Sequence, residues 1–187
     1  TAGTVTATIS NTAISDLVSV TETGNALTIT VATTTVAASD LITVDAATTS
    51  AVNATAVTRI NGSVADAKTL ITAVNSSNIT GLNTSQFSLS DTGSNTTTDI
   101  LTITAFTSGR VTSVADTYVG SVAHFGNADG TDANSFLGLI ASNDLVTNSA
   151  FAIVFTAEST VTATAMLGIL SSVNDTNKLN FDVSVDA

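Results

Sequence analysis

The sequence predicts an α/β fold in which short strands and helices alternate. Pieces rich in Thr and Val cover residues 4–10, 27–35 and 51–60, and each alternates apolar with hydroxyl side chains. That period of two is typical of a half-buried strand. The pieces begin 23 and 24 residues apart, and a helix-like stretch follows each of them. The first half of the chain is therefore expected to be a repeat of about 24 residues.

The expected helices cover residues 12–23, 35–48 and 63–76. The third is the clearest, because five apolar residues fall on one helical face: Val64, Ala67, Leu70, Ile71 and Val74. The N-caps expected from side chains that can accept a backbone N–H are Asn11, Thr35 and Ser63. The first two helices also share a core, since Ser15-Asp16-Leu17 returns as Ser39-Asp40-Leu41.

A single strand–helix repeat cannot bury its apolar face. We therefore expect the repeats to stack in a solenoid-like manner, with their strands in parallel. A mainly-β fold, either a sandwich or a β-solenoid, is the alternative. Val and Thr favour strands, and residues 16–32 fit a hairpin that turns at 23–25.

The second half is less regular and predicts a mixed α+β region. We expect residues 1–85 to form the strand–helix repeats and residues 86–187 to form this mixed region, tightly joined to the first or continuous with it. The elements expected are a hairpin from 86–93 and 100–106, a strand over 110–125, a helix over 133–141, a buried strand over 150–157, a helical stripe over 166–173 and a last strand over 179–187.

Composition excludes several classes of function. The chain has four Lys and Arg residues against 15 Asp and Glu, with a net charge of −11. Nucleic-acid binding needs several cationic contacts to phosphate, so no nucleic-acid partner is expected. No apolar run is long enough to span a bilayer, so no membrane insertion is expected either. With only 10% charged residues, the surface is expected to consist of Thr, Ser and Asn.

Residue types that carry catalysis are scarce, and we predict that the chain is not an enzyme. His124 is the single histidine, and no G-x-S-x-G nucleophile elbow or phosphate-binding glycine loop accompanies it. A surface position at a loop edge is the expected role for His124. The two Glu residues, Glu22 and Glu158, are too isolated to indicate a glycosidase pair.

The best chemical signal is a loop that predicts a calcium site. Asn127, Asp129 and Asp132 alternate around Gly130, which allows a sharp turn. Calcium binds six to eight oxygens, and short Asp and Asn side chains supply them. The alternative is a plain polar turn that precedes the next helix. A weaker loop of the same kind covers residues 90–99. No other cofactor is predicted.

Residues 21–71, together with ITGLNTSQFSLSD at 79–91, resemble the tandem repeats of very large secreted surface proteins of cyanobacteria. The shared features are a TGNA strand followed by T-I-T-V, a V-A-A-x-D-L helix and a V-x-A-x-A-V-T strand. The resemblance covers residues 4–91. It implies an extracellular structural role in a surface layer, an adhesin stalk or a filament, and it brings no catalytic residues.

Repeat, composition and resemblance together predict an extracellular, self-assembling structural subunit or repeat segment of a bacterial surface layer or filament. The expected partners are copies of the chain itself, joined through the terminal strands at 4–10 and 180–187, because an unpaired strand edge is a template for another chain. The few Lys and Arg residues suit an extracellular setting, since trypsin-like proteases cleave there. The alternatives are an adhesin or carbohydrate-binding module, and a phage fibre or decoration protein.

Overall fold

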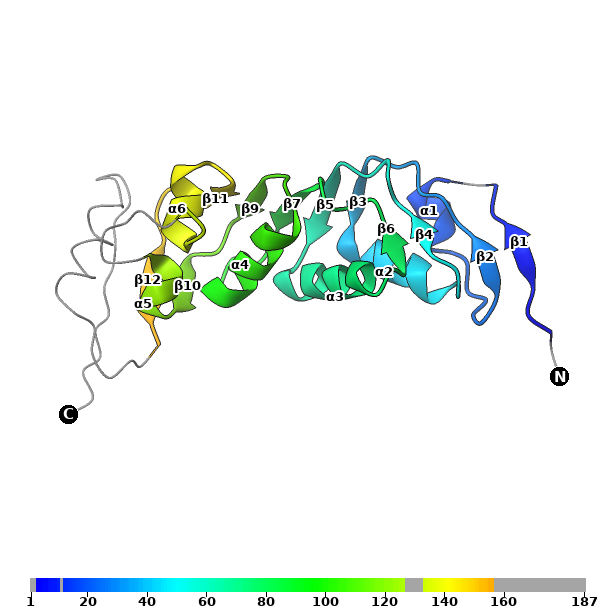
Figure 1. Ribbon diagram of the computed structural model, residues 1–187, viewed down its shortest axis with the longest axis horizontal. Helices are drawn as coiled ribbons and strands as arrows, with labels where there is room; N and C mark the ends of the chain where they lie inside the picture. Colours follow the sequence, from blue (N-terminus) through cyan, green and yellow to red (C-terminus); the bar gives the residue numbers. More distant parts are fainter. Residues whose placement is uncertain (1–2, 11, 127–132, 157–187) are drawn as a thin grey trace. The chain divides into compact units, whose positions relative to one another are not determined.

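The computed structural model describes residues 3–10, 12–126 and 133–156, and it divides into two compact units (Figure 1). Unit 1 is residues 1–88 with 106–109, and unit 2 is residues 89–105 with 110–187. Strands and helices alternate along the described chain. All pairs with a defined register are parallel: β1–β2, β3–β5, β4–β6, β8–β10, β10–β12 and β9–β11. The α/β prediction is confirmed.

The strands of unit 1 lie in two rows. One row holds β1 (Thr6–Thr8), β2 (Ala26–Thr28), β4 (Val52–Asn53) and β6 (Ile79–Thr80), with a parallel bridge between Thr30 and Asn53 that links β2 to β4. The other row holds β3 (Thr35–Ala37), β5 (Arg59–Gly62) and β7 (Gln86–Leu89). In the register, Thr35 faces Arg59, so paired strands are 24 residues apart, the period expected from the sequence.

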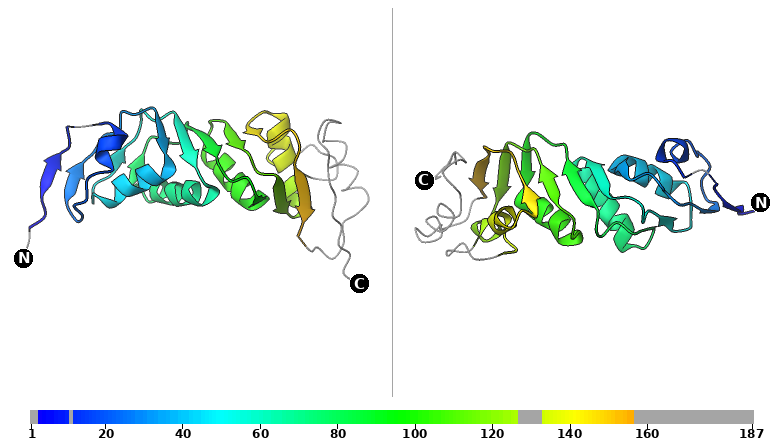
Figure 2. Two further views of the ribbon diagram at one scale, coloured as in Figure 1. Left: turned by 180° about the vertical axis from the view of Figure 1, so that it is seen from behind. Right: turned by 90° about the horizontal axis from the view of Figure 1, so that it is seen from above.

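Three helices complete unit 1: α1 (Ile14–Leu17), α2 (Ala38–Ala46) and α3 (Val64–Asn75). Helix α2 packs against α3 and also contacts α1, as Figure 2 shows. The twin Ser-Asp-Leu segments are both helical, and both of their leucines, Leu17 and Leu41, are buried. On α3, four of the five predicted core residues are buried, which confirms that helix and its face.

The core of unit 1 consists of one buried apolar residue from each strand and the inner faces of the helices. In the first row, Ile29, Val52 and Ile79 are at most 1% exposed. In the second row, Val36 pairs with Ile60, and both are buried. Each repeat therefore buries its apolar side chains against those of its neighbour, which a lone repeat cannot do.

In unit 2, β8 (Ser94–Thr96), β10 (Thr117–Gly120) and β12 (Ala152–Phe155) lie side by side, and β9 (Val111–Ser113) pairs with β11 (Leu145–Val146). The helices are α4 (Thr97–Phe106), α5 (Val122–Phe125) and α6 (Phe136–Ala141). The predicted helix over 133–141 and strand over 150–157 are confirmed with shorter bounds. The stripe over 166–173 and the last strand over 179–187 lie outside the described residues.

Both predicted hairpins are wrong. Residues 16–32 do not form one, because Leu17 ends α1 and β2 pairs in parallel with β1. Residues 100–106 belong to helix α4 and not to a strand. The Thr96 hydroxyl accepts the backbone N–H of Asp99 and so caps that helix. Ile100 and Ile103 then share a buried face at a spacing of three, which a helix satisfies as well as a strand satisfies alternation.

Other boundaries also differ from the prediction. The strand expected over 110–125 divides into β9, β10 and helix α5. Helix α1 covers four residues and not the whole of 12–23, and its N-cap Ala13 makes no side-chain bond; Asn11 itself lies outside the described residues. Thr35 is a strand residue, so the N-cap of α2 is Ala37, again without a side-chain bond. Ser63 is confirmed as the N-cap of α3, since its Oγ accepts from Asp66 N.

Strand and helix meet at a close contact that recurs in the two units. Gly62-Ser63-Val64-Ala65 and Gly120-Ser121-Val122-Ala123 have the same sequence, and both serines cap the helix that follows. A Cβ atom built on Gly62 would lie 3.2 Å from the Ala38 Cβ, and one built on Gly120 would overlap the Thr97 hydroxyl. Ala38 and Thr97 are each the first residue of a helix, so glycine lets the strand pass the start of the neighbouring helix.

Within the described residues, no helix is both long enough and apolar enough to cross a membrane.

We predict that Gly120→Ala lowers the free energy of unfolding of unit 2. The added methyl group would overlap the fully buried Thr97, and overpacking of this kind costs about 1–3 kcal/mol. Gly93→Ala is the matched control, because a Cβ there meets no atom within 4 Å. Urea unfolding followed by the fluorescence of Tyr118, the single tyrosine, measures both. Equal midpoints for the two variants would contradict the close contact.

Candidate functional site

The polar side chains of this protein mainly bind backbone groups of the neighbouring repeat. Thr48 shows the arrangement. Its Oγ1 donates to Leu27 O at 2.8 Å and accepts from Leu27 N at 2.9 Å, across 21 residues of sequence. The same oxygen accepts from Ser50 N at 3.1 Å, which holds its own turn. One hydroxyl thus joins two successive repeats of unit 1.

Thr107 repeats this arrangement at the other end of unit 1. Its Oγ1 donates to Ser85 O at 2.7 Å and accepts from Gly109 N at 2.9 Å. The Ser85 hydroxyl in turn donates to Val57 O at 2.8 Å. Ser85 and Thr107 are both buried. We call Thr48, Ser85 and Thr107 the hydroxyl bridges, because each carries a side-chain hydrogen bond from one repeat to the one before it.

These hydroxyl bridges correct an expectation from composition. The sequence analysis assigned Ser, Thr and Asn to the surface, but several of them are buried: Ser85, Asn95, Thr97, Thr107, Ser113 and Ser135. A signal for the bridges does exist in the sequence. Thr48 and Thr107 each stand two residues before a Ser or Gly and four before a Val that is fully buried. Surface threonines are so common here that this spacing is recognisable only once the contacts are known.

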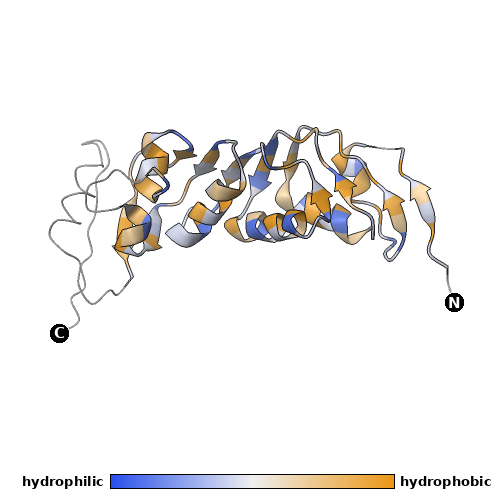
Figure 3. Cartoon of the chain, viewed as in Figure 1, coloured by the Kyte–Doolittle hydropathy of each residue, from blue (hydrophilic) through white to orange (hydrophobic). Residues whose placement is uncertain are grey.

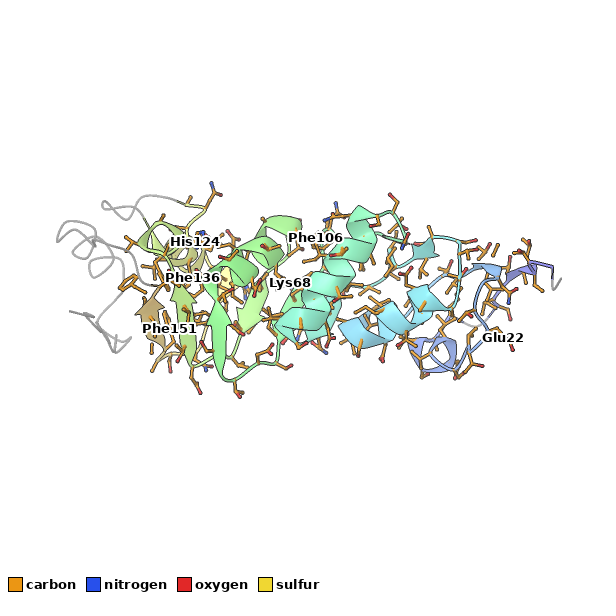
Figure 4. All side chains as sticks on the ribbon, turned by 90° about the horizontal axis from the view of Figure 1, so that it is seen from below. Glu22, Lys68, Phe106, His124, Phe136 and Phe151 are labelled. Atoms are coloured by element: carbon orange, nitrogen blue, oxygen red, sulfur yellow. The ribbon has the colours of Figure 1, made fainter. Side chains whose placement is uncertain are left out.

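The predicted calcium ligands Asn127, Asp129 and Asp132 lie outside the described residues. In the weaker loop over 90–99, residues 94–96 form β8, and Asp99 stands in the first turn of α4. Among the described residues, no three His, Cys, Asp or Glu side chains come together in a way that could hold a metal ion. Glu22 and Lys68 of unit 1 lie well apart, as Figure 4 shows.

His124 lies in the first turn of α5 and is half-buried. Its backbone N–H donates to Ser121 Oγ, and its Nδ1 lies 3.4 Å from Thr98 Oγ1. Asp45 is the described carboxyl group with a shifted pKa. Burial raises that pKa, and a hydrogen bond from the Asn78 side chain opposes the shift. Neither residue belongs to a described group of chemically reactive side chains.

Aromatic side chains gather in the interior of unit 2. The ring of Tyr118 lies 4.5 Å from that of Phe136 and 5.2 Å from that of Phe151, measured between centroids. Figure 4 labels the two phenylalanines. The Tyr118 hydroxyl donates to Ser113 Oγ at 2.8 Å. Burial is the main cause that raises the pKa of Tyr118 to about 12; the nearby Asp116 charge adds to it, and the bond to Ser113 opposes it.

The feature best suited to contact another molecule is the outer edge of β1. All three residues of β1 are exposed, and Val5 beside it is 55% exposed, the one large apolar side chain that is exposed in the described chain. On its inner side, β1 pairs with β2 from Thr6–Ala26 to Thr8–Thr28. No described strand pairs with its outer side. An open edge of this kind is a template for a further strand.

Comparisons of the chain with protein-family models, with curated proteins and with solved structures found no match. The resemblance to cyanobacterial surface-protein repeats therefore stays a prediction.

We predict that Thr107→Val destabilises unit 1. The substitution keeps the shape of the side chain but leaves Ser85 O and Gly109 N without the hydroxyl, and an unsatisfied buried polar group costs about 1–3 kcal/mol. Thr69→Val is the control, because that exposed hydroxyl bonds only within helix α3. Hydrogen exchange of the Gly109 amide measures the effect directly. Unchanged exchange in Thr107→Val would show that the bridge contributes nothing.

We also predict that unit 2 loses stability in alkaline solution through Tyr118. The folded pKa of about 12 lies above the ordinary value of 10.0, so the stabilising contribution is complete below pH 10 and is lost as the pH rises through 12. Tyr118→Phe cannot ionise and should lack this part of the pH dependence. Thermal unfolding followed by circular dichroism between pH 8 and about pH 12 compares the two proteins. Parallel curves would refute the assignment.

Proposed function

We propose that this chain is an extracellular structural protein, a self-assembling subunit or repeat segment of a bacterial surface layer or filament. The observation that carries the proposal is the use of polar side chains. Hydroxyl groups that could line a binding site are instead bonded to the backbone of the neighbouring repeat, as Thr48 and Thr107 are. A chain built in this way spends its polar chemistry on joining repeats.

We propose that the repeats of residues 1–85 stack in a solenoid-like manner. Support comes from parallel strands that pair at intervals of 20, 24 and 27 residues, as Thr6–Ala26, Thr35–Arg59 and Val52–Ile79 do. In repeat proteins each repeat contacts only its neighbours, so the array can be extended without a new kind of contact. Such arrays suit spacers and surface coats.

The scarcity of grouped ionisable side chains also supports a structural role. In the described chain no cluster of metal-binding residues forms, and His124 stands apart from the carboxyl group of Asp45 in a different unit. A carbohydrate-binding module usually presents exposed aromatic platforms, yet none of the described aromatic side chains is exposed. The structural proposal is therefore preferred to the adhesin and to an enzyme. A phage fibre or decoration protein would use the same architecture in another setting.

Calcium belongs to the proposal as a possible bridge between subunits of net charge −11, with Asn127, Asp129 and Asp132 as its ligands. Titration calorimetry with calcium chloride tests this part by itself. Asp129→Asn should weaken the binding, whereas Glu22→Gln, which removes the same charge from an exposed site in unit 1, should not. Equal heats for the two variants would remove Asp129 from the site.

We predict ordered assemblies when the purified chain is concentrated, either filaments or sheets in negative-stain electron microscopy. The comparison is made with calcium and with a chelator, because bound cations reduce the repulsion between acidic subunits. Sedimentation velocity supplies the matching mass distribution. A chain that stays monomeric at high concentration in both conditions would overturn the self-assembly proposal.

A further inference from the structure

The segment that carries β1 is palindromic in residue type. It reads Thr4-Val5-Thr6-Ala7-Thr8-Ile9-Ser10, and Ala7 stands at its centre. Thr6 matches Thr8, Val5 matches Ile9, and Thr4 matches Ser10. If two copies of this strand lie antiparallel with Ala7 opposite Ala7, each β-branched apolar residue faces another and each hydroxyl residue faces another. Cross-strand pairs of these kinds stabilise an antiparallel sheet.

The backbone of β1 is oriented for this pairing. Val5 O accepts from Ala26 N at 2.9 Å, and Ile9 N donates to Thr28 O at 3.0 Å, so these residues bond inward to β2. Successive residues of a strand direct their backbone groups to opposite sides. Thr6 and Thr8 therefore direct their N–H and C=O groups to the outer edge. In the antiparallel pair, Thr6 of one copy would exchange two hydrogen bonds with Thr8 of the other.

The side chains of β1 also lack the cover that the next strand has. Thr8 faces Thr28 in the register, so Ile9 is the neighbour of Ile29, and Ala7 is the neighbour of Leu27. Leu27 is 6% and Ile29 1% exposed, whereas Ala7 is exposed and Val5 is 55% exposed. Figure 3 shows hydrophobic and hydrophilic residues in alternation along β1. A strand added to this edge continues the β1–β2 sheet and covers Val5.

Charge also favours this end of unit 1 as the meeting point of two copies. The chain has a net charge of −11, yet residues 1–15 contain no Asp, Glu, Lys or Arg. Like charges directly opposite each other destabilise a strand pair. The β1 edge is free of that cost, and added salt screens the repulsion between the remainder of the two chains.

We propose that β1 binds a second copy of this chain, antiparallel and about a two-fold axis at Ala7. The pairing extends β1–β2 into the order β2–β1–β1–β2 across the two copies. Such a contact is isologous, so it closes on itself as a dimer and needs no second surface. It deepens the self-assembly proposed above, on which it rests, because it names the edge, the direction and the register of one contact.

Single cysteine substitutions test the register, because the chain contains no cysteine. In the proposed pair, the two Ala7 residues are a non-hydrogen-bonded pair with Cα atoms about 4.5 Å apart, within the range of a disulfide. Ala7→Cys should therefore give a covalent dimer as the main product on oxidation. Gly3→Cys is the matched control: it is equally exposed, but the two copies of residue 3 would lie about 27 Å apart. Equal cross-linking of the two variants would overturn the proposal.

A second variant tests the edge itself. Thr6→Pro removes an N–H that faces outward, and proline is tolerated at such an edge position because the bonds to β2 come from other residues. Sedimentation equilibrium should give twice the chain mass for the unmodified protein and the chain mass for Thr6→Pro, with unchanged far-ultraviolet circular dichroism. If Thr6→Pro misfolds, the comparison of the two cysteine variants decides the matter.

The outcomes separate this inference from the proposed function. Filaments or sheets that persist in Thr6→Pro, without Ala7→Cys cross-linking, would overturn the β1 pairing and leave self-assembly through another surface. An unmodified chain that is monomeric at every concentration would overturn both. A dimer that cross-links through Ala7→Cys and forms nothing larger would support the β1 pairing and contradict the surface layer or filament.

Discussion

The structure depends on hydrogen bonds that join each strand–helix repeat to the one before it. Parallel strand pairs supply most of them, and the hydroxyl bridges add bonds where the strands have ended. Thr48 binds both backbone groups of Leu27, and Thr107 links to Ser85, whose own hydroxyl reaches Val57. A repeat of small apolar residues buries modest area, so bonds of this kind matter more than they would in a core of large side chains.

The constraint explains the unusual composition. A buried hydroxyl must find a partner, and backbone carbonyls at the ends of the neighbouring strand offer one at a fixed spacing. Threonine meets this need and also favours strands, so it serves on the surface, in the strands and inside the repeat junctions. Glycine has a second fixed role where a strand passes the start of a helix, as Gly120 passes Thr97. Unit 2 adds a cluster of aromatic rings around Tyr118.

A structural role follows from the same bonds. Polar groups that are satisfied by the neighbouring backbone are not available to hold a substrate, and a row of parallel strands leaves an edge where it ends. The edge at β1 differs from the inner strands in its exposed Val5 and its uncharged, palindromic sequence. Strand edges are usually blocked by charges or proline, so an edge without either is open to pairing. For this reason we place the contact between copies there.

The sequence by itself determined the α/β class, the period near 24, the Ser63 cap and the buried face of α3, because each depends on residues close together in the chain. Tertiary structure decided the rest. The tetrapeptide Leu-Thr-Ile-Thr begins in strand β2 at 27–30 and lies in helix α4 at 101–104. Its alternation fits a strand, but the Thr96 cap and the burial of Ile100 with Ile103 select the helix in the second case. The hydroxyl bridges were equally hidden, since their partners lie 21 to 28 residues away and only the fold brings them within hydrogen-bond distance.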